Sequence, residues 1–130
     1  MLRGQRILNP QLLAALAGAA HTQLVVLADP GLPLPPGVPV VDLSLVPGIP
    51  TLAQALQAVA GALVVEAAVA AEESRGGEVA GVISESLRGV PVELVSHERF
   101  KQLLPGAHVI VRTGDCRPYA NVALVAGVPF

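Results

Sequence analysis

Short apolar runs alternate along this chain with segments of helical pattern, and proline or glycine separates many of them. Short runs of β-branched and aliphatic residues between turn signals are typical of strands, whereas apolar residues at i, i+3 and i+4 are typical of helices. Strands that alternate with helices form a mainly parallel sheet that is covered on both faces. The sequence therefore predicts a single α/β domain over residues 1–130, with three layers and a mainly parallel or mixed sheet of about six strands.

The boundaries of the expected elements follow from these runs and from the capping residues beside them. Strands are expected at Leu24–Ala28, Val38–Leu43, Leu63–Val69, Val92–Ser96, Val109–Arg112 and Asn121–Ala126. Helices are expected at Pro10–Ala19, from Thr51 to just before Gly61, after Gly76-Gly77 with Val79, Val82, Ile83 and Leu87 on one face, and at Glu98–Leu104. The run Leu63–Val69 is apolar on both faces, so a helix remains an alternative there.

The charge content is low for a chain of this size, because 52% of the residues are hydrophobic and only 14% are charged. An ordinary soluble domain carries about 25% charged residues, so part of the surface must be apolar. Two explanations compete: a membrane protein, or an oligomer that buries its surface against its own copies. The richest apolar stretch, 55–71, contains Gln57 and Glu66, and a spanning helix needs about 20 consecutive apolar residues. We therefore expect no membrane segment and a homo-oligomer.

Several classes of function are disfavoured by what the chain lacks. A net charge of −2 argues against nucleic acid, and the only aromatic residues, Phe100, Tyr119 and Phe130, form no stacking platform for bases. A single cysteine, Cys116, forms neither an internal disulfide nor a thiolate zinc site and fits a reducing compartment. No dinucleotide, phosphate-loop or metal-ligand motif is present. Among enzymes, proton chemistry with no cofactor and no metal remains.

The N-terminus leaves one question of localisation open on pattern alone. Arg3 and Arg6 precede the apolar run 12–20, which ends in small residues as a secretory signal does. Against a signal, Asn9-Pro10 has the pattern of a helix start, with Asn as the N-cap and Pro at the first helical position.

A few polar residues stand where a pocket of an α/β sheet forms, outside the carboxyl ends of strands. Asp29 follows the first strand, and His97 follows the strand 92–95 at the start of a helix. Lys101 comes one turn later on the same helix face. Each also has a plainer interpretation: Asp29 as a loop cap, His97 as a solvated helix start and Lys101 as a solvated charge.

The remaining polar groups have plainer interpretations as well. His21, between the first helix and the first strand, has the position of a helix cap or dipole partner, and His108 has no polar company. Five carboxylates are interpreted as surface charge: Glu72, Glu73, Glu78, Glu85 and Glu93.

Three segments together carry a more specific pattern: HTQLVVLADPGLP at 21–33, SHERFK at 96–101, and RTGDCRPYAN at 112–121 with Ala126-Gly127-Val128 after it. In this order the chain resembles the family of sugar-ring isomerases that comprises ribose pyranase and fucose mutarotase. The resemblance covers essentially the whole chain. It implies a cytoplasmic enzyme, a ring-like homodecamer with active sites at subunit contacts, and interconversion of the pyranose and furanose forms of D-ribose without a cofactor.

The resemblance also implies roles for individual residues. His21 would be the catalytic proton donor, and Lys101 would lie near the sugar site. The residues expected to line that site are Asp29, His97, Tyr119, Ala120 and Asn121, with 119–121 contributed to a neighbour's pocket. A Pro-Tyr-Ala-Asn sequence at 118–121 favours ribose pyranase over fucose mutarotase. Because family members carry a helix before this histidine without export, the resemblance also disfavours the secretory signal.

Departures from the family pattern keep alternatives open. Gln23 stands where the family usually has aspartate, which removes a carboxylate next to His21, and Asp115 replaces the usual glutamate. The segment between Glu73 and Val92 is shorter than usual, and we expect this to trim a surface helix without touching the site. The alternatives are a fucose mutarotase-type activity and a non-catalytic sugar-binding accessory protein on the same scaffold.

Overall fold

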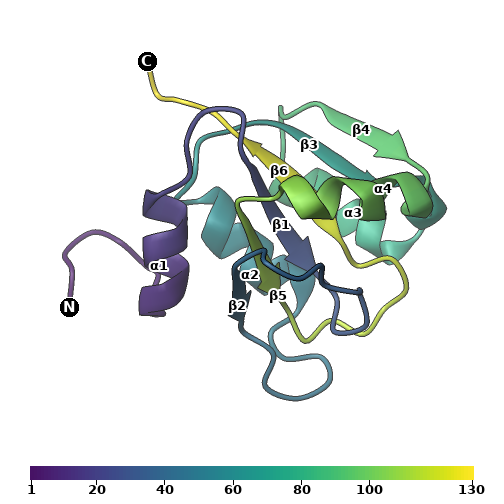
Figure 1. The fold of residues 1–130 in the computed structure, drawn as a ribbon, viewed down its shortest axis with the longest axis horizontal. Helices are drawn as coiled ribbons and strands as arrows, with labels where there is room; N and C mark the ends of the chain where they lie inside the picture. Colours follow the sequence, from purple (N-terminus) through teal and green to yellow (C-terminus); the bar gives the residue numbers. More distant parts are fainter.

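The computed structural model describes residues 1–130 and places one six-stranded sheet among four α-helices (Figure 1). The strands are β1 (Leu24–Ala28), β2 (Val40–Asp42), β3 (Val65–Ala71), β4 (Val92–Val95), β5 (Val109–Arg112) and β6 (Val122–Ala126). The helices are α1 (Pro10–Ala17), α2 (Leu52–Ala60), α3 (Glu78–Ser86) and α4 (His97–Leu103), and two short 3-10 turns lie at Glu72–Ser74 and Leu104–Gly106.

The sheet has the strand order β2-β5-β1-β6-β3-β4 and is mixed. The pairs β1–β5, β2–β5 and β3–β4 are parallel, whereas β6 runs antiparallel to both of its neighbours, β1 and β3. A parallel crossover needs a dozen or more residues, usually with a helix, and only the loop 113–121 joins β5 to β6. This short connection makes β6 the one reversed strand, and the predicted mixed α/β sheet is confirmed.

Helices cover both faces of the sheet, which gives the three predicted layers (Figure 1). Along β1, alternate side chains point to opposite faces, as the period of a strand requires. Val25 and Leu27 pack in the larger core cluster with α1, α2 and α3, while Val26 packs in the smaller one with Phe100 of α4. The central strands are therefore buried on both sides, which is why they read as continuous apolar runs.

Local signals explain where the helices begin. The Asn9 side chain accepts a hydrogen bond of 2.8 Å from the backbone N–H of Leu12, and Pro10 occupies the first helical position. Thr51 and Gln54 form a capping box at the start of α2. Ser96 caps α4 through the backbone N–H of Arg99, so α4 begins at His97, one residue earlier than predicted.

Element ends differ from the predicted ones by a few residues. Helix α1 ends at Ala17 rather than Ala19, because the chain turns after Gly18 toward β1. Strand β3 begins at Val65 rather than Leu63, whose backbone N–H still bonds to the carbonyl of Val59 in α2. The helical alternative for 63–69 is wrong, since β3 pairs with β4 and β6. No helix is long and apolar enough to cross a membrane.

Candidate functional site

The polar residues predicted at strand ends meet at one edge of the sheet. Asp29 follows β1 and His97 follows β4, and these two strands share a direction. The segment Tyr119–Asn121 precedes β6, and because β6 runs the opposite way its beginning lies at the same edge. We call this side of the sheet the carboxyl edge, after the carboxyl ends of β1 and β4. Five of the seven predicted site residues lie there: Asp29, His97, Tyr119, Ala120 and Asn121.

Asp29 and Asn121 lock together at this edge. The Asn121 side chain is completely buried and accepts a hydrogen bond of 2.7 Å from the backbone N–H of Asp29. Its amide nitrogen donates to Asp29 Oδ2 at 2.8 Å. The other carboxylate oxygen of Asp29, Oδ1, accepts a hydrogen bond of 2.8 Å from the backbone N–H of Gly31. The half-buried carboxylate of Asp29 is therefore fixed in orientation before any ligand arrives.

His97 and Tyr119 form an aromatic pair beside them. Their ring centroids lie 5.1 Å apart with the planes at 73°, an edge-to-face arrangement. Tyr119 has a left-handed backbone with φ of 58°, which is uncommon for a bulky residue and frequent at binding sites. The Nδ1 atom of His97 is buried and has no hydrogen-bond partner. Such an atom is available to a ligand that reaches it.

Glu73 is a component of this edge that sequence reasoning missed, because it was interpreted as surface charge. Both of its carboxylate oxygens lie 3.0 Å from the backbone nitrogen of His97, which donates to them. Glu73, Arg117 and Tyr119 also line a cavity of about 300 Å³ at this edge. The signal in the sequence was its position directly after β3, whose carboxyl end lies beside that of β4.

Lys101 lies one helical turn beyond His97 on α4, as predicted. Its ammonium pairs with Glu98 Oε1 at 2.6 Å, and this pairing lowers the pKa of the exposed Glu98 carboxyl below its ordinary value. The half-buried Lys101 is near the carboxyl edge in the fold, but within the single chain its charge is directed to its own helix.

The loop that carries Tyr119 is anchored by an ion pair between the buried Asp115 and the half-buried Arg117. Arg117 donates to Asp115 through two nitrogens, Nε to Oδ1 at 2.9 Å and Nη2 to Oδ2 at 2.7 Å. Asp115 also accepts from the backbone N–H of Leu52, at the start of α2, at 2.8 Å. The hydrogen bond from Arg117, opposed by burial and supported by the Leu52 N–H, lowers the pKa of Asp115 to about 2. The residue at position 115 therefore fastens the site loop to α2.

His21 lies at the opposite edge of the sheet, in the turn that enters β1. Its Nε2 is 3.0 Å from Oε2 of Glu66 in β3, and both side chains are about half exposed. Strand β1 has 5 residues, so it spans roughly 16 Å at about 3.3 Å per residue. That length separates His21 from Asp29, and a single chain therefore does not bring His21 together with the carboxyl edge.

The glutamine at position 23 has a structural part in this turn. Its Oε1 accepts a hydrogen bond of 2.7 Å from the backbone N–H of Ala20. The carboxylate expected beside His21, and thought lost with Gln23, is supplied by Glu66 instead. Sequence reasoning did not single out Glu66; its signal was a lone carboxylate within an apolar strand.

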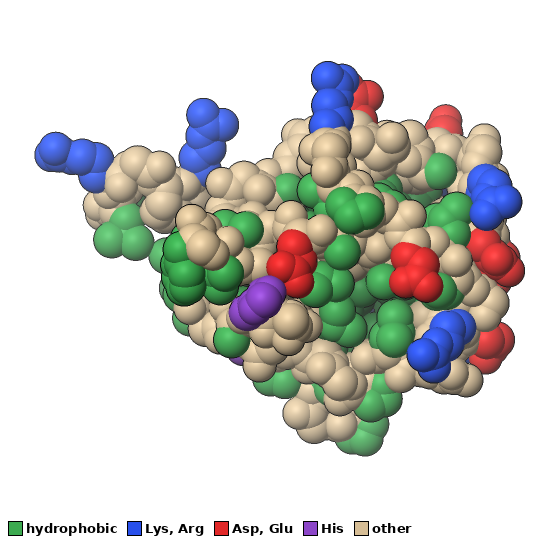
Figure 2. All heavy atoms as spheres, turned by 90° about the horizontal axis from the view of Figure 1, so that it is seen from above, with side chains coloured by type: hydrophobic (Ala, Val, Ile, Leu, Met, Phe, Trp, Pro, Cys, Tyr) green, Lys and Arg blue, Asp and Glu red, His purple; other side chains and the backbone are tan.

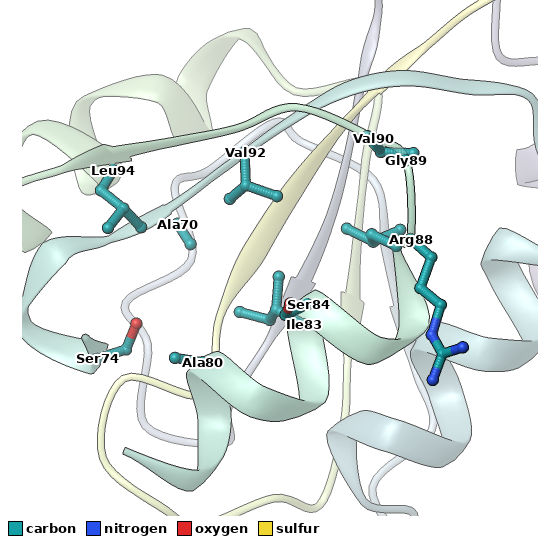
Figure 3. Close-up of a pocket in the computed structure, with 11 residues that line it drawn as sticks. Ala70, Ser74, Ala80, Ile83, Ser84, Arg88, Gly89, Val90, Val92 and Leu94 are labelled. Atoms are coloured by element: carbon teal, nitrogen blue, oxygen red, sulfur yellow. The ribbon is translucent and has the colours of Figure 1, made fainter. Parts of the chain in front are cut away.

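A second hollow, of about 550 Å³, separates α3 from the edge strand β4 (Figure 3). Val92 and Leu94 of β4 and Ile83 of α3 line it, whereas the Arg88 guanidinium points away from it. Its polar lining residues are Ser74, Ser84 and Arg88, and it contains no carboxylate and no imidazole that could transfer a proton near neutral pH. No three histidine, cysteine, aspartate or glutamate side chains are grouped so as to hold a metal ion.

Comparison with known proteins indicates the family to which this chain is similar. The model of the RbsD / FucU transport protein family matches residues 2–129. The chain is 46% identical to the D-ribose pyranase of Pseudomonas putida over 127 residues, which cover 95% of this chain and 96% of that protein. It is 46% identical to the D-ribose pyranase of Symbiobacterium thermophilum over 126 residues, with 95% and 96% covered.

Two solved structures have the same fold. RbsD of Bacillus subtilis, solved with D-ribose, superposes with a TM-score of 0.93 at 39% identity and covers 99% of this chain and 100% of its own. The fucose mutarotase of Streptococcus pneumoniae, solved with L-fucose, superposes with a TM-score of 0.84 at 20% identity over 99% and 100% of the two chains, and this likeness concerns the fold alone. From the fold and these matches together, the chain belongs to the RbsD / FucU family.

Proposed function

We propose that this protein is a D-ribose pyranase, an isomerase that interconverts the pyranose and furanose forms of D-ribose. The observation that carries the proposal is the 46% identity to D-ribose pyranases across 95% of the chain. The superposition on a structure that holds D-ribose, with a TM-score of 0.93, supports the same substrate.

The reaction is proton chemistry on a hemiacetal. The ring oxygen gains a proton as its bond to the anomeric carbon breaks, and the anomeric hydroxyl loses one. The ring then closes through a different hydroxyl, and no carbon–hydrogen bond is broken, so the steps require no electron sink. One well-placed acid or base accelerates such a step by roughly 10²- to 10⁴-fold.

The proposed site residues have two roles: His21 transfers the proton, and the others bind and orient the sugar. His21 is the proposed proton donor to the ring oxygen, since imidazole changes charge near neutral pH. His97, through its unpartnered Nδ1, and Asp29 are proposed to orient the sugar by hydrogen bonds to its hydroxyls. Tyr119 offers a phenol to the sugar hydroxyls, and Lys101 stabilises negative charge that develops on oxygen. Ala120 is fully buried in the larger core cluster, so its contribution to the sugar site would be through its backbone. Asn121 contributes by holding Asp29.

The active site would form between two copies of the chain. His21 lies a strand length away from Asp29 and Tyr119, too far for one sugar to touch both within a chain. A neighbouring copy that places its carboxyl edge against His21 completes the site, in a homo-oligomer for which we propose a decamer. The wide apolar areas on the surface, visible between isolated charges in Figure 2, fit burial against other copies. We place the enzyme in the cytoplasm.

Saturation-transfer NMR on D-ribose tests this proposal. The wild-type protein should speed exchange between the pyranose and furanose forms relative to buffer, and His21→Ala should remove most of that gain. Exchange at the buffer rate with wild-type protein would refute the pyranase assignment. If calorimetry nevertheless detects ribose binding, the protein is a sugar-binding accessory protein. Faster exchange for L-fucose than for D-ribose would indicate a fucose mutarotase instead.

A further inference from the structure

We propose that Glu66 is the positioning residue of His21: it holds the imidazole with a proton on Nε2 and so leaves Nδ1 to exchange protons with the sugar. This inference rests on the proposed function, in which His21 transfers the proton. The contact that begins the argument is the 3.0 Å separation between His21 Nε2 and Glu66 Oε2, which joins the turn before β1 to β3.

Glu66 occupies an irregular position in the sheet. Val65 pairs with Ala126 of β6, but Ala67 pairs with Val125, so Glu66 is an extra residue that has no partner on β6. A bulge of this kind bends the strand and redirects a side chain, and bulges are frequent next to active sites. The bulge here directs a carboxylate to His21 from an otherwise apolar strand.

Gly127 leaves the room that this carboxylate uses. A Cβ atom at position 127 would lie 3.2 Å from Val64 Cγ1, 3.3 Å from Glu66 Cβ and 3.3 Å from Glu66 Oε2, which is tighter than most Cβ contacts, so Glu66 would have to shift. The backbone N–H of Gly127 also bonds to the carbonyl of Val64 at 2.7 Å, which fixes the glycine against the bulge. The missing side chain at 127 thus allows the Glu66 carboxylate to remain beside His21.

Hydrogen bonds also fix the turn that carries His21. Thr22 has φ of 72°, a left-handed conformation that is unfavourable for a β-branched residue and needs support from its surroundings. Its backbone N–H bonds to the carbonyl of Ala126 at 2.8 Å, and Gln23 closes the turn onto Ala20. His21 and Glu66 are therefore both fixed relative to the end of β6, from two segments far apart in sequence.

The contact with Glu66 determines which nitrogen of His21 exchanges protons with the sugar. Glu66 is an acceptor when ionised, so the Nε2–H of a neutral His21 is directed to it and the lone pair of Nδ1 is free. In ring opening, Nδ1 takes the proton of the anomeric hydroxyl. The oxygen's electron pair forms the carbonyl, the bond from the anomeric carbon to the ring oxygen breaks, and the ring oxygen takes that pair and the same proton from Nδ1. The two oxygens share one carbon, so a single nitrogen can serve both. The carboxylate stabilises the imidazolium in between, as in a catalytic triad.

Three variants measured by NMR exchange at varied ribose concentration test the role of Glu66. Glu66→Ala should lower kcat by roughly 10- to 100-fold because His21 loses its orientation, with KM changed less than about twofold. Glu66→Gln should retain more activity than Glu66→Ala, because its amide oxygen still accepts the Nε2–H. Glu93→Ala, which removes an exposed strand glutamate without any ion pair or hydrogen bond, is the matched control and should behave as wild type.

The outcomes separate this inference from the proposed function. Three results would show that Glu66 does not position His21 in an active wild-type protein. They are an unchanged kcat in Glu66→Ala, a change in KM alone in that variant, or the same kcat in Glu66→Ala and Glu66→Gln. If wild-type protein itself is inactive, the proposed function fails. Should Glu66→Ala not fold, Glu66→Asp takes its place: one methylene shorter, it should fall below Glu66→Gln in kcat, and the reverse order overturns the inference.

Discussion

Asp29 and Asn121 bond to each other twice at the carboxyl edge, once from the backbone N–H of Asp29 to Asn121 Oδ1 and once from Asn121 Nδ2 to Asp29 Oδ2. The asparagine reaches the end of β1 from the start of the reversed strand β6. The pair therefore joins two adjacent strands and also fixes the orientation of the Asp29 carboxylate, so the same contact stabilises the fold and shapes the candidate site.

Replacing Asn121 by alanine should be costly for stability. The change leaves the backbone N–H and the carboxylate of Asp29 without these partners at a site where Asn121 is fully buried. An unsatisfied buried group costs about 1–3 kcal/mol, so the free energy of unfolding should fall by roughly 2–3 kcal/mol. Urea denaturation measures it, with Gln102→Ala on the exposed face of α4 as the control. A loss below about 0.5 kcal/mol would show that water replaces the asparagine.

The Asp115–Arg117 pair should make stability depend on acidic pH. The pKa of Asp115 is lowered from 3.8 to about 2 in the fold, first by the hydrogen bond from Arg117. A group with a depressed folded pKa contributes stability above its unfolded pKa and loses that contribution as pH falls through the folded value. At about 1.4 kcal/mol for each tenfold change in proton affinity, the contribution at pH 7 is about 2 kcal/mol.

Denaturation of wild type and Asp115→Asn over a pH series measures this contribution. The difference in unfolding free energy should be constant from pH 7 to about pH 5 and shrink by about half at pH 3. Asp42→Asn, whose carboxylate is exposed and paired with Arg112, is the control and should show a smaller difference. A difference that stays constant down to pH 3 would mean that Asp115 is not the group that titrates.

Two glycines should respond to alanine in opposite directions. At Gly114 a Cβ atom would lie 2.3 Å from the carbonyl oxygen of Ile49, a backbone atom that cannot move aside, so Gly114→Ala should lower stability by about 2 kcal/mol or more. At Gly81, within α3, no atom beyond the backbone of its own helix lies within 4 Å of the added methyl, and Gly81→Ala should raise stability by about 0.5–1 kcal/mol. Thermal unfolding of both variants checks the signs, and two changes in the same direction would contradict the close approach at Gly114.

The elements of the fold could be predicted because their causes are local. Asn9 and Thr51 start helices through their own neighbours, and the apolar runs mark the strands. The carboxyl edge could be predicted in part, since Asp29 and His97 each follow a strand. The resemblance to a known family supplied His21 and the segment 119–121.

The missed residues depend on contacts between distant segments. Glu66 meets His21 only because β3 lies beside β6 and carries a bulge there, and a one-residue irregularity leaves no mark in the hydrophobic pattern. Glu73 reaches His97 only because β3 and β4 are neighbours. Asp115 looked like a mere departure from a family pattern, yet it joins the site loop to the start of α2.

Mixing two inactive variants tests whether the active site needs two copies. His21→Ala damages one edge of the chain and Tyr119→Ala the other, so each protein alone should lack activity. If each site takes His21 from one copy and Tyr119 from its neighbour, a site in a mixed assembly is intact when a Tyr119→Ala chain supplies His21 to a His21→Ala chain. With equal amounts, random assembly leaves about one quarter of the sites intact.

The variants should be co-expressed, or unfolded together and refolded, so that chains exchange. Saturation-transfer NMR of the mixture should then show about a quarter of the wild-type rate. Two variants that both damage the carboxyl edge, Asp29→Ala and Tyr119→Ala, provide the control and should recover nothing, because every site would lack one of the two. No recovery in the first mixture, with chain exchange verified by mass, would mean that no active site combines His21 of one copy with Tyr119 of another. A stable monomer in light scattering would also refute the shared site.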